Sequence, residues 1–463
     1  MEIFINNFKE RMEEIVLKDE YNSLSFITLI RNIIYYKHYY KNLGLTGKNV
    51  ILSLENSVEW IVSFLSLASI NAKIIPMSSS LNIQHIEEVL PDIKVVPTLS
   101  KGIIRSFSNS SIDWNLINKN LKIDKDNVII HITSGSTGEP KLCERTYKSL
   151  INEGFNYKSY LYITEKDHIL NPLPLSHSFA FGFSLIASMV SGAKLTIMNS
   201  YNTRKLVSMI DSEKPTLVPC VPFIAENLVN LFLKETKNVS SVRTLLIGAG
   251  KVKYETRVSL LSKYGFHTSL NYGSTETGGI VTNTNMTPKN SIGKPMNNVK
   301  IKILNEDTLE EVEPRVRGEI WVKSPSIFNG YINEKSTMFN QDGYFPMGDL
   351  GYKDKDGNLF LIKRKDKTIK ISGQNINLTY IEHKLSNIEG VLDCKVFVKT
   401  SPSNEFIIKA LIQSVKNNEK SKMSIKKLVK RELPAYMIPH LLFVDKIPKN
   451  ELGKKAVNVG GYE

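Results

Sequence analysis

Residues 127–141, NVIIHITSGSTGEPK, give the clearest indication of how this chain folds. An apolar, β-branched run is followed at once by small residues, which predicts a buried strand that ends in a tight loop. Glycines bring backbone N–H groups close to an anion, hydroxyl groups add donors, and Lys141 adds a positive charge. We therefore interpret the loop as a phosphate-binding element, although such a loop taken alone is equally compatible with a plain surface turn. It is not a Walker loop, because Pro140 precedes Lys141 where that motif needs glycine, and it is not the GxGxxG of dinucleotide folds.

Similar β-branched runs recur along the chain and alternate with longer stretches of helical period. They are NVILSL (49–54), AKIIPM (72–77), AKLTIM (193–198) and TLLIG (244–248). This alternation predicts an α/β fold with parallel sheets in the larger part of the chain. Past residue 290, alternating segments with frequent turns, including VKIKIL (299–304) and GEIWVK (318–323), predict a β-rich subdomain.

The pattern changes again near Lys363, where mixed α and β signals return. An amphipathic helix is predicted over residues 378–385 and a Lys-rich helix near 423–432, while SVKNNEKSKMS (414–424) reads as a surface loop. We therefore expect an N-terminal domain (residues 1–363) of two α/β subdomains plus a β-rich subdomain. A small, mobile α+β domain (residues 364–463) follows it. At 463 residues, more than one domain is the expected outcome.

The composition is that of a globular protein, with 41% hydrophobic and 23% charged residues. The longest apolar stretches, near residues 60–70 and 179–190, are shorter than the roughly 20 residues that span a bilayer. The N-terminus also lacks the apolar core of a signal peptide. We therefore expect a cytoplasmic protein without membrane insertion. Cys143, Cys220 and Cys394 lack metal-ligand or disulfide-framework spacing.

The net charge of +14 is concentrated near the C-terminus, since residues 363–463 hold 20 Lys and Arg against 10 Asp and Glu. Nucleic acid, acidic lipid, a phosphorylated substrate or an acidic protein would each suit this bias. Because no basic run interleaves with aromatic residues, we do not expect a nucleic-acid partner.

Seven further segments follow the loop in a fixed order. They are LPLSH (173–177), GAGKV (248–252), YGSTE (272–276), GYFPMGDLG (343–351), RKDKTIKISG (364–373), LPAYMIP (433–439) and PKNELGK (448–454). Together with residues 131–141, this ordered series resembles the superfamily of acyl-adenylate-forming (AMP-binding) enzymes. That superfamily includes acyl-CoA synthetases, aryl acid ligases, nonribosomal peptide synthetase adenylation domains and luciferases. The resemblance extends from about Asn49 to Lys454.

The resemblance implies that ATP and Mg²⁺ are required and that a carboxylate attacks the α-phosphorus of ATP. Both reactants are anionic, so catalysis depends on positioning and on cations. By similarity, the loop holds the β- and γ-phosphates through Thr133, Ser134, Gly135, Ser136, Thr137, Gly138 and Lys141. Glu276 resembles the Mg²⁺ ligand, because one carboxylate with phosphate oxygens is enough for this hard cation. Without the resemblance, Glu276 would read as a solvated surface residue.

The nucleoside contacts are also implied by the resemblance. Tyr272 matches the aromatic residue that stacks on adenine. Asp349 matches the acid that accepts hydrogen bonds from both ribose hydroxyls, and Arg364 matches a second ribose contact. The remaining residues assigned to the nucleotide by the same matches are Gly248, Ala249, Gly250, Gly273, Ser274 and Thr275.

Lys454 resembles the family's mobile lysine, which bridges the attacking carboxylate and an α-phosphate oxygen. Its neighbour Lys455 is the alternative in register, and the match to a Gly-Lys pair favours Lys454. The family rotates its small domain about a hinge two residues after the ribose-binding arginine, which is Asp366 here. After rotation, Gly373 would line the tunnel for a thiol, where a side chain would block passage.

The acid site implied by the resemblance begins at His177, which matches a gating aromatic residue and joins Lys454 and Glu276 as the expected catalytic set. Amino-acid-activating relatives place an aspartate directly after this position to pair with the substrate ammonium. Ser178 stands there and cannot neutralise a buried cation, so we expect an aryl or aliphatic acid without a free α-amine. Phenylalanines nearby indicate either an apolar pocket or plain core packing; they are Phe179, Phe181, Phe183 and Phe223. The residues assigned to the acid are His177, Ser178, Phe181 and Gly278.

The expected products are an acyl-adenylate and pyrophosphate, followed by a thioester. The basic C-terminal region suits either the phosphates of CoA or an acidic carrier protein, and the sequence does not separate the two acceptors. The alternatives are an amino-acid-activating enzyme that loads a carrier protein, a catalytically inactive nucleotide-binding homologue, a luciferase-like monooxygenase, and an ATPase that releases ADP.

Overall fold

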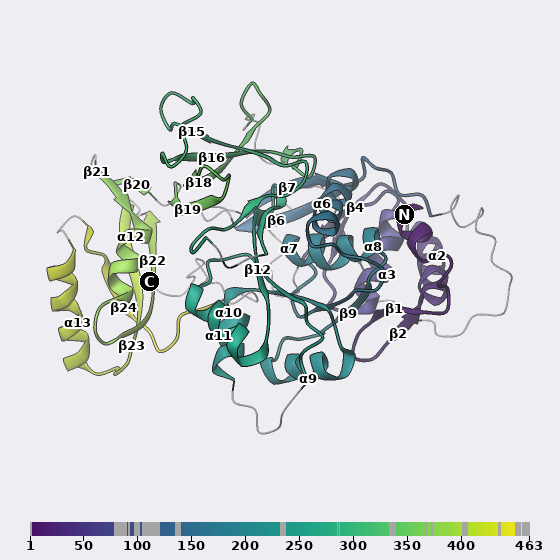
Figure 1. Cartoon of the computed structure of the whole chain (residues 1–463), viewed down its shortest axis with the longest axis horizontal. Helices are drawn as coiled ribbons and strands as arrows, with labels where there is room; N and C mark the ends of the chain where they lie inside the picture. Colours follow the sequence, from purple (N-terminus) through teal and green to yellow (C-terminus); the bar gives the residue numbers. More distant parts are fainter. Residues whose placement is uncertain are drawn as a thin grey trace.

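Three sheets form the main body of the protein, and a smaller C-terminal unit lies beside it (Figure 1). The computed structural model describes residues 2–77, 90, 93–96, 102–103, 121–134, 140–231, 238–284, 286, 288–332, 339–365, 368–371, 374–400, 406–433, 437–449 and 455. Within these residues, the architecture is the α/β class that the sequence predicts.

The largest sheet has nine strands, and its centre is parallel, as expected where helices cover a buried sheet. Antiparallel pairs close both ends of this sheet. In sheet order the strands are β14 (Lys294–Pro295), β13 (Gly278–Asn283), β12 (Thr268–Ser274), β11 (Thr244–Ile247), β10 (Leu217–Cys220), β8 (His168–Asn171), β9 (Lys194–Ile197), β1 (Ile15–Lys18) and β2 (Ser23–Ser25).

The second sheet has six strands, and two of them flank the predicted phosphate-binding loop. In order they are β17 (Gly330–Tyr331), β7 (Pro140–Thr146), β6 (Val128–Ser134), β4 (Lys73–Pro76), β3 (Asn49–Leu52) and β5 (Lys94–Val95). Strand β6 pairs in parallel with β4 and antiparallel with β7, so the chain enters the loop on β6 and leaves it on β7.

The β-rich subdomain expected past residue 290 is an antiparallel sheet of four strands. They are β15 (Lys300–Leu304), β16 (Gly318–Lys323), β18 (Phe345–Lys353) and β19 (Leu359–Arg364). Gly357, in the turn between β18 and β19, has φ of 81°, a left-handed conformation that favours glycine.

Four helices of the main body begin at a residue whose side chain caps them. Side chains of Ser25, Ser57, Thr146 and Asn202 accept hydrogen bonds from the first turns of their helices. The helices are α1 (Glu2–Phe8), α2 (Phe26–Asn42), α3 (Val58–Ala68), α6 (Tyr147–Tyr160), α7 (Ser178–Ala180), the π-helix η1 (Phe181–Ile186), α8 (Ala187–Ser191), α9 (Thr203–Glu213), α10 (Pro222–Asn230) and α11 (Tyr254–Tyr264).

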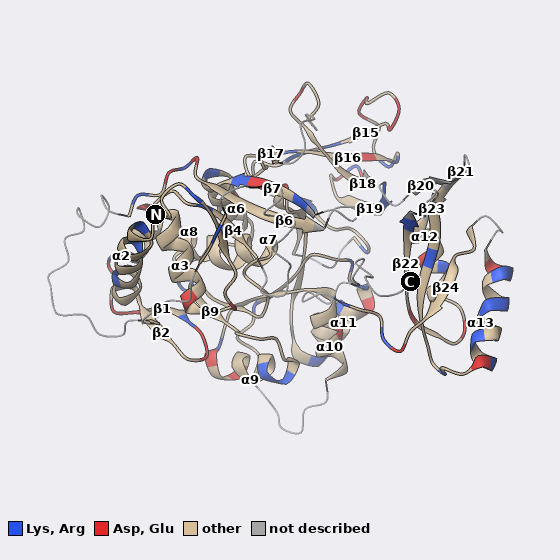
Figure 2. Ribbon diagram, turned by 180° about the vertical axis from the view of Figure 1, so that it is seen from behind, with Lys and Arg blue, Asp and Glu red and all other residues tan. Residues whose placement is uncertain are grey.

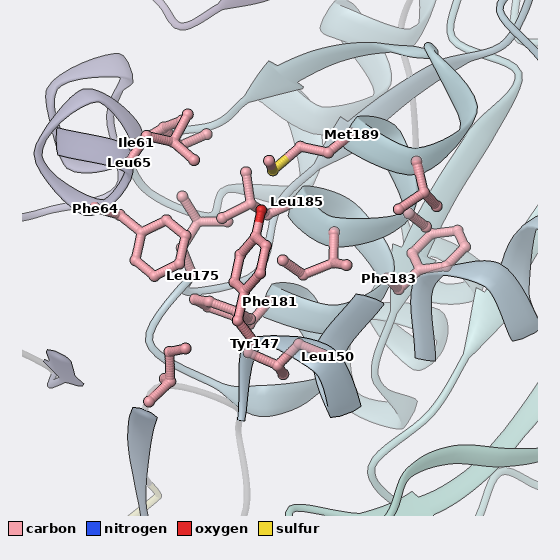
Figure 3. Close-up of a cluster of buried hydrophobic side chains, with 14 of the residues drawn as sticks. Ile61, Phe64, Leu65, Tyr147, Leu150, Leu175, Phe181, Phe183, Leu185 and Met189 are labelled. Atoms are coloured by element: carbon pink, nitrogen blue, oxygen red, sulfur yellow. The ribbon is translucent and has the colours of Figure 1, made fainter. Parts of the chain in front are cut away.

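A single large core joins the two α/β sheets. Figure 3 shows part of it, where side chains from α3 and α6 meet those of η1. Phe181 is fully buried there, and its ring contacts Phe64 edge-on with centroids 5.0 Å apart. Burial of such aromatic side chains fixes η1 against the sheets and therefore fixes the start of α7, where His177 lies.

The C-terminal unit has a core of its own, formed where α12 and α13 pack on a three-stranded sheet. Its elements are β20 (Thr368–Ile371), β21 (Gln374–Asn377), α12 (Leu378–Ser386), β22 (Val391–Thr400), β23 (Phe406–Ser414), α13 (Glu419–Glu432) and β24 (His440–Phe443). The division at residues 363/364 stays a prediction, and Asp366 lies outside the described residues. One expectation was wrong: residues 419–424 are helical, because Asn418 caps α13 and starts the helix earlier.

None of the helices in the described part of the chain is both long enough and apolar enough to cross a membrane.

Candidate active site

Three of the residues predicted to bind the nucleotide meet at one place. Tyr272, at the end of β12, donates a hydrogen bond of 2.7 Å from its hydroxyl to Oδ2 of Asp349 on β18. Arg364 lies directly opposite Asp349 on β19, and its Nε is 3.4 Å from Oδ1 of Asp349. The guanidinium also donates to the carbonyl of Met347 at 3.2 Å. The fold therefore joins side chains that are 77 and 15 residues apart in sequence into one cluster.

The electrostatics of this cluster favour the neutral form of the Tyr272 phenol. Burial, and then the negative charge of Asp349, raise the pKa of Tyr272 well above its usual value, while Arg364 opposes the shift. Tyr272 therefore keeps its proton and remains a donor to Asp349. The guanidinium group also lies beside Gly348, where a Cβ would be 3.4 Å from Nη2 of Arg364, an ordinary van der Waals distance.

A second cluster contains the lysine predicted to bind phosphate and the predicted Mg²⁺ ligand. The ammonium group of Lys141, on β7, lies 4.7 Å from the ring centroid of Tyr331 on the neighbouring strand β17. The hydroxyl of Tyr331 donates a hydrogen bond of 2.6 Å to Oε1 of Glu276, in the turn after β12. The carbonyl of Glu276 in turn accepts from the backbone N–H of Phe328 at 2.7 Å. Tyr331 thus connects the predicted phosphate-binding lysine to the predicted Mg²⁺ ligand.

The loop itself is described only at its two ends. Thr133 on β6 lies opposite Lys141 on β7, and Ser134 lies opposite Pro140, so the strands bring the two ends of the loop together. The predicted residues Gly135, Ser136, Thr137 and Gly138 lie outside the described residues.

Glycine is required at several positions around the turn that carries Glu276. A Cβ on Gly273 would lie 1.9 Å from the carbonyl oxygen of Gly278, and Gly278 itself has φ of 67°. A Cβ on Gly248 would lie 2.9 Å from Cε1 of Phe179. These close approaches hold the chain at Gly248 against α7 and hold β12 against β13.

Ala249, which is predicted to contact the nucleotide, has φ of 60°, a left-handed conformation unusual for a residue with a side chain. Gly250 follows it, and a Cβ there would lie 3.1 Å from Cγ of Pro222. This short segment therefore follows a tight path at the end of β11, as its small residues indicate.

On the acid side, His177 is the N-cap residue of α7, and Ser178 begins the helix. The Ser178 hydroxyl is hydrogen-bonded to the hydroxyl of Thr275 at 3.2 Å, which links α7 to the turn that holds Glu276. Nearby, the hydroxyl of Tyr157 donates to Oδ1 of Asn271 at 3.2 Å. Asn271, next to Tyr272 on β12, was not anticipated from the sequence.

The phenylalanines near this site differ in their surroundings. Phe181 and Phe183 are fully buried in the main core, while Phe179 and Phe223 are partly exposed. Core packing, the alternative left open by the sequence, therefore describes Phe181 and Phe183. Their part in substrate binding stays a prediction.

A buried ion pair connects the strands and the helix that lie around these clusters. Arg145 on β7 and Glu153 on α6 have no exposed side-chain surface, and their atoms Nη1 and Oε2 are 2.8 Å apart. Oε1 of Glu153 accepts from the backbone N–H of Gly279 at 3.1 Å, and Nη2 of Arg145 donates to the carbonyl of Ser326 at 2.8 Å. Sequence reasoning missed this pair, because nothing in the spacing marks a charge as buried.

Lys454, Asp366 and Gly373 all lie outside the described residues. Lys455 is described, and its ammonium group lies 2.6 Å from Oδ1 of Asp393 on β22, within the C-terminal unit.

The described residues contain no group of three or more His, Cys, Asp or Glu side chains that could hold a metal ion. Glu276 nevertheless fits Mg²⁺ by its chemistry, since it is a partly exposed carboxylate beside the phosphate-side lysine. Mg²⁺ commonly takes one or two protein carboxylates and completes its shell with water and phosphate oxygens.

Comparison with known proteins gives concordant results. A family model described as AMP-binding enzyme matches residues 4–332. A 4-coumarate–CoA ligase of Pinus taeda is 30% identical over 353 residues, which cover 72% of this chain but 65% of that protein, less than two thirds of its length. 4-Coumarate–CoA ligase 1 of Oryza sativa subsp. japonica is 25% identical over 464 residues, covering 89% of this chain and 82% of that protein.

Among solved structures, the o-succinylbenzoate coenzyme A synthetase (MenE) of Bacillus subtilis in complex with AMP has a TM-score of 0.78 and 23% identity. The match covers 99% of this chain and 98% of that one, which shows a shared fold. Because the family model spans more than half of the sequence, and because the clusters lie where the family's motifs were matched, the chain belongs to the family of AMP-binding enzymes.

Proposed function

We propose that the protein activates a carboxylic acid with ATP, releases pyrophosphate, and transfers the acyl group from the acyl-adenylate to a thiol. The observation that carries the proposal is the arrangement around β12. A Tyr272–Asp349–Arg364 cluster suited to a nucleoside lies at the end of this strand. A Lys141–Tyr331–Glu276 cluster suited to phosphates follows in the next turn.

The assigned roles follow from charge. Asp349, with a hydrogen-bonded carboxylate, accepts the ribose hydroxyls, and Arg364 is held beside it for a second contact. Lys141 offsets the negative charge of the β- and γ-phosphates, which would otherwise repel an incoming carboxylate. Glu276 would hold Mg²⁺, which when bound neutralises phosphate charge. Lys454 supplies the last cation, between the carboxylate and the α-phosphate.

For the acid, we propose an aryl or aliphatic carboxylic acid without a free α-amine. Ser178 is neutral and partly exposed, and its hydroxyl is engaged with Thr275, so no carboxylate stands at this position to pair with an ammonium group. Phe179, Asn271 and Tyr157 surround this region with aromatic and amide groups. The names of the relatives, which are ligases of aromatic acids, support the aryl alternative.

For the acceptor, we propose CoA, as the names of the relatives indicate, with a carrier protein as the second candidate. The positive charge of the C-terminal unit suits either one. Figure 2 shows basic residues along α13, at the outer side of this unit. They are Lys420, Lys422, Lys426, Lys427, Lys430 and Arg431.

The three cysteines are buried and unpaired, which supports a cytoplasmic location.

Between the two half-reactions, residues 364–463 are proposed to rotate as a domain about Asp366 and to bring Gly373 to the thiol tunnel. Gly373→Trp should then impair thioester formation and leave adenylation intact. Equal loss in both steps would contradict the tunnel assignment.

The decisive experiment is ATP–pyrophosphate exchange across a panel of aryl, aliphatic and amino acids, with product analysis. AMP and pyrophosphate are expected, whereas ADP and phosphate would indicate an ordinary ATPase. Thioester formation with CoA and with a holo carrier protein then separates the acceptors. Lys454→Ala should lower exchange by orders of magnitude, while Lys427→Ala, an exposed lysine of the same unit, should leave it unchanged. Failure of every acid to support exchange would favour an inactive homologue.

A further inference from the structure

A buried carboxylate on β16 takes no part in the clusters described above. The side chain of Glu319 is only 6% exposed. Burial of an ionised carboxylate is unfavourable unless a cation or hydrogen-bond donors compensate it. Among the described residues, the cation within ion-pair distance is Lys365, whose Nζ lies 2.7 Å from Oε2 of Glu319. This pair joins β16 to the residue that directly follows the end of β19.

The side chain of Lys365 crosses an intervening strand to reach Glu319. In sheet order, β18 lies between β16 and β19 (Figure 1). Glu319 lies opposite Leu350 on β18, and Leu350 lies opposite Lys363 on β19. These three residues form one row across the sheet, so their side chains share one face. Lys365, two residues after Lys363, returns to that face, and its side chain passes over β18.

The predicted ribose contacts lie on the other face of the same strand end. Arg364 lies opposite Asp349 and directly precedes Lys365, so the two basic side chains leave the chain on opposite faces. The contacts between Arg364 and Asp349 are long, because Nε to Oδ1 and Nη1 to Oδ2 are both 3.4 Å. The Arg364 side chain is also 43% exposed. The backbone N–H of Lys365, by contrast, donates to the carbonyl of Gly348 at 2.7 Å.

The end of β19 needs such support because of its place in the sheet. This strand is the outermost of its sheet, and Arg364 is its last residue. Native structure opens most readily at the ends of elements, and such an opening would carry Arg364 away from Asp349. A short hydrogen bond between charged groups, with the carboxylate largely buried, is stronger than an exposed ion pair. The contact between Lys365 and Glu319 therefore opposes the opening.

We propose that Glu319 is a positioning residue for the nucleotide. Through Lys365 it holds the end of β19, and so keeps Arg364 beside Asp349, where both contact the ribose. This inference rests on the proposed function and on the roles assigned to Arg364 and Asp349 in it. It adds a residue on β16 that touches no part of the nucleotide and acts on the nucleotide through Arg364.

The test is Glu319→Gln in the full-length protein, with calorimetric titration of AMP and of 2′,3′-dideoxy-AMP. The Kd for AMP should rise about threefold to tenfold, the equivalent of one weakened hydrogen bond. The Kd for 2′,3′-dideoxy-AMP should hardly change, because that nucleotide has no ribose hydroxyl groups for the cluster to bind. The preference for AMP should therefore fall. Partial unfolding would reduce the binding of both nucleotides alike and leave the preference unchanged.

A second variant tests whether Glu319 acts through Arg364. In an Arg364→Ala background, Glu319→Gln should cause little further loss of AMP affinity, because the two residues contribute to one contact. An equal loss in both backgrounds would overturn the positioning role. Lys365→Arg retains a cation that reaches Glu319 and should keep the preference for AMP.

Glu311→Gln is the matched control. Glu311 pairs with Lys353, the last residue of β18, at 3.5 Å, so the variant removes a carboxylate from another ion pair of the same sheet. Lys353 lies four residues beyond Asp349 along β18. We expect the affinities for both nucleotides to match those of the unmodified protein.

Amide hydrogen exchange gives a readout independent of nucleotide binding. In Glu319→Gln, the peptide that covers residues 359–365 should exchange faster. Unchanged exchange of that peptide, or an unchanged preference for AMP over 2′,3′-dideoxy-AMP, would overturn the inference. If the unmodified protein showed no preference for AMP, the ribose site and the proposed function would be overturned instead. Hydrogen exchange would then still decide whether Glu319 holds the end of β19.

Discussion

At the scale of single residues, Tyr331 connects two groups that the sequence motifs treat separately. Its ring faces the ammonium group of Lys141, and its hydroxyl donates to Glu276. A hydrogen bond to a charged group contributes about 1.5–3 kcal/mol. The tyrosine therefore fixes the direction of the carboxylate that is proposed to hold Mg²⁺.

Removal of that hydroxyl gives the first prediction. Tyr331→Phe keeps the ring under Lys141 but frees Glu276, so the Mg²⁺ concentration that half-saturates pyrophosphate exchange should rise about threefold to tenfold. The KM for the acid should not change. An Mg²⁺ titration of exchange by the variant measures this, and an unaltered titration curve would show that Tyr331 does not orient the ligand.

The second prediction concerns His131, which is buried on β6 with no hydrogen-bond partner for either ring nitrogen among the described residues. Burial, and then the charges of Arg145 and His177, lower its pKa to about 3. In the unfolded chain the His131 imidazole binds a proton as the pH falls through about 6.5, whereas in the folded chain it stays neutral there. The free energy of unfolding should therefore fall as the pH drops from about 6.5 toward 3.

His131→Leu removes this dependence without removing a hydrogen bond. We compare the free energy of unfolding of the variant with that of the unmodified protein at each pH. This difference should be about 2 kcal/mol more favourable to the variant at pH 5 than at pH 8, because one pKa unit corresponds to about 1.4 kcal/mol. Urea unfolding at the two pH values gives the difference. The exposed His383 provides the control, as His383→Leu, and an equal effect of His131→Leu at both pH values would contradict the assignment.

Site residues that lie within a recognisable sequence motif could be predicted, and site residues outside any motif could not. Tyr272, Asp349 and Arg364 were assigned one by one from their motifs, and the structure places them in contact. Tyr331 sits in a strand of two residues, which carries no signal of chemistry. Asn271 precedes a motif residue, yet only the fold reveals that Tyr157 fixes its side chain.

At the scale of elements, the buried pair Arg145–Glu153 joins β7 to α6 and also reaches β13 and the segment at Ser326. The pair packs against glycine backbone, since Cβ atoms on Gly182 and Gly278 would lie 2.2 and 2.4 Å from the Glu153 carboxyl group. Because these elements carry Lys141 and flank the Glu276 turn, the pair sets their relative positions.

Breaking the pair gives the third prediction. Arg145→Met leaves the Glu153 carboxylate buried and uncompensated, so the free energy of unfolding should fall by about 3–5 kcal/mol. The double variant Arg145→Met with Glu153→Leu should recover more than half of that loss. Urea unfolding of the single and double variants is the measurement. A loss below about 1 kcal/mol in Arg145→Met would show that the pair is not a structural requirement.

The strands and helices were predicted best where the hydrophobic periodicity of a segment agrees with the turn residues at its ends. The strands at residues 49–54, 127–132 and 244–248 were found because β-branched runs end at turn residues. The start of α13 was missed, because its first turn is polar on all sides and carries no apolar period. The π-helix η1 could not be predicted either, because its sequence FGFSLI is as apolar as any buried segment.

At the scale of the whole molecule, and among the residues that the structure describes, the two main hydrophobic clusters contain no residue after Leu361. The clusters of the C-terminal unit contain none before Ile376. The main body therefore does not depend on the small unit for its core. This separation is what the change of sequence pattern near Lys363 indicated, although how the two parts are arranged could not be read from periodicity.

A chain ending at Lys365 gives the fourth prediction. It should unfold cooperatively and bind AMP, because Tyr272, Asp349 and Arg364 remain, but it should lose pyrophosphate exchange by orders of magnitude without Lys454. Thermal unfolding and calorimetric AMP titration test the two parts. A truncated chain that does not fold would show that the body requires the C-terminal unit.

The position of β19 has a mechanical consequence. This strand is the outermost of its sheet, it ends with the arginine that contacts Asp349, and the chain passes from it into the small unit. A tensile load applied to the small unit as a whole would therefore separate β19 from β18 one hydrogen bond at a time, starting at the end that carries the Arg364–Asp349 pair. Pulling the small unit away from the main body would separate Arg364 from Asp349, the two proposed ribose contacts, before it disturbed the hydrophobic core of the main body.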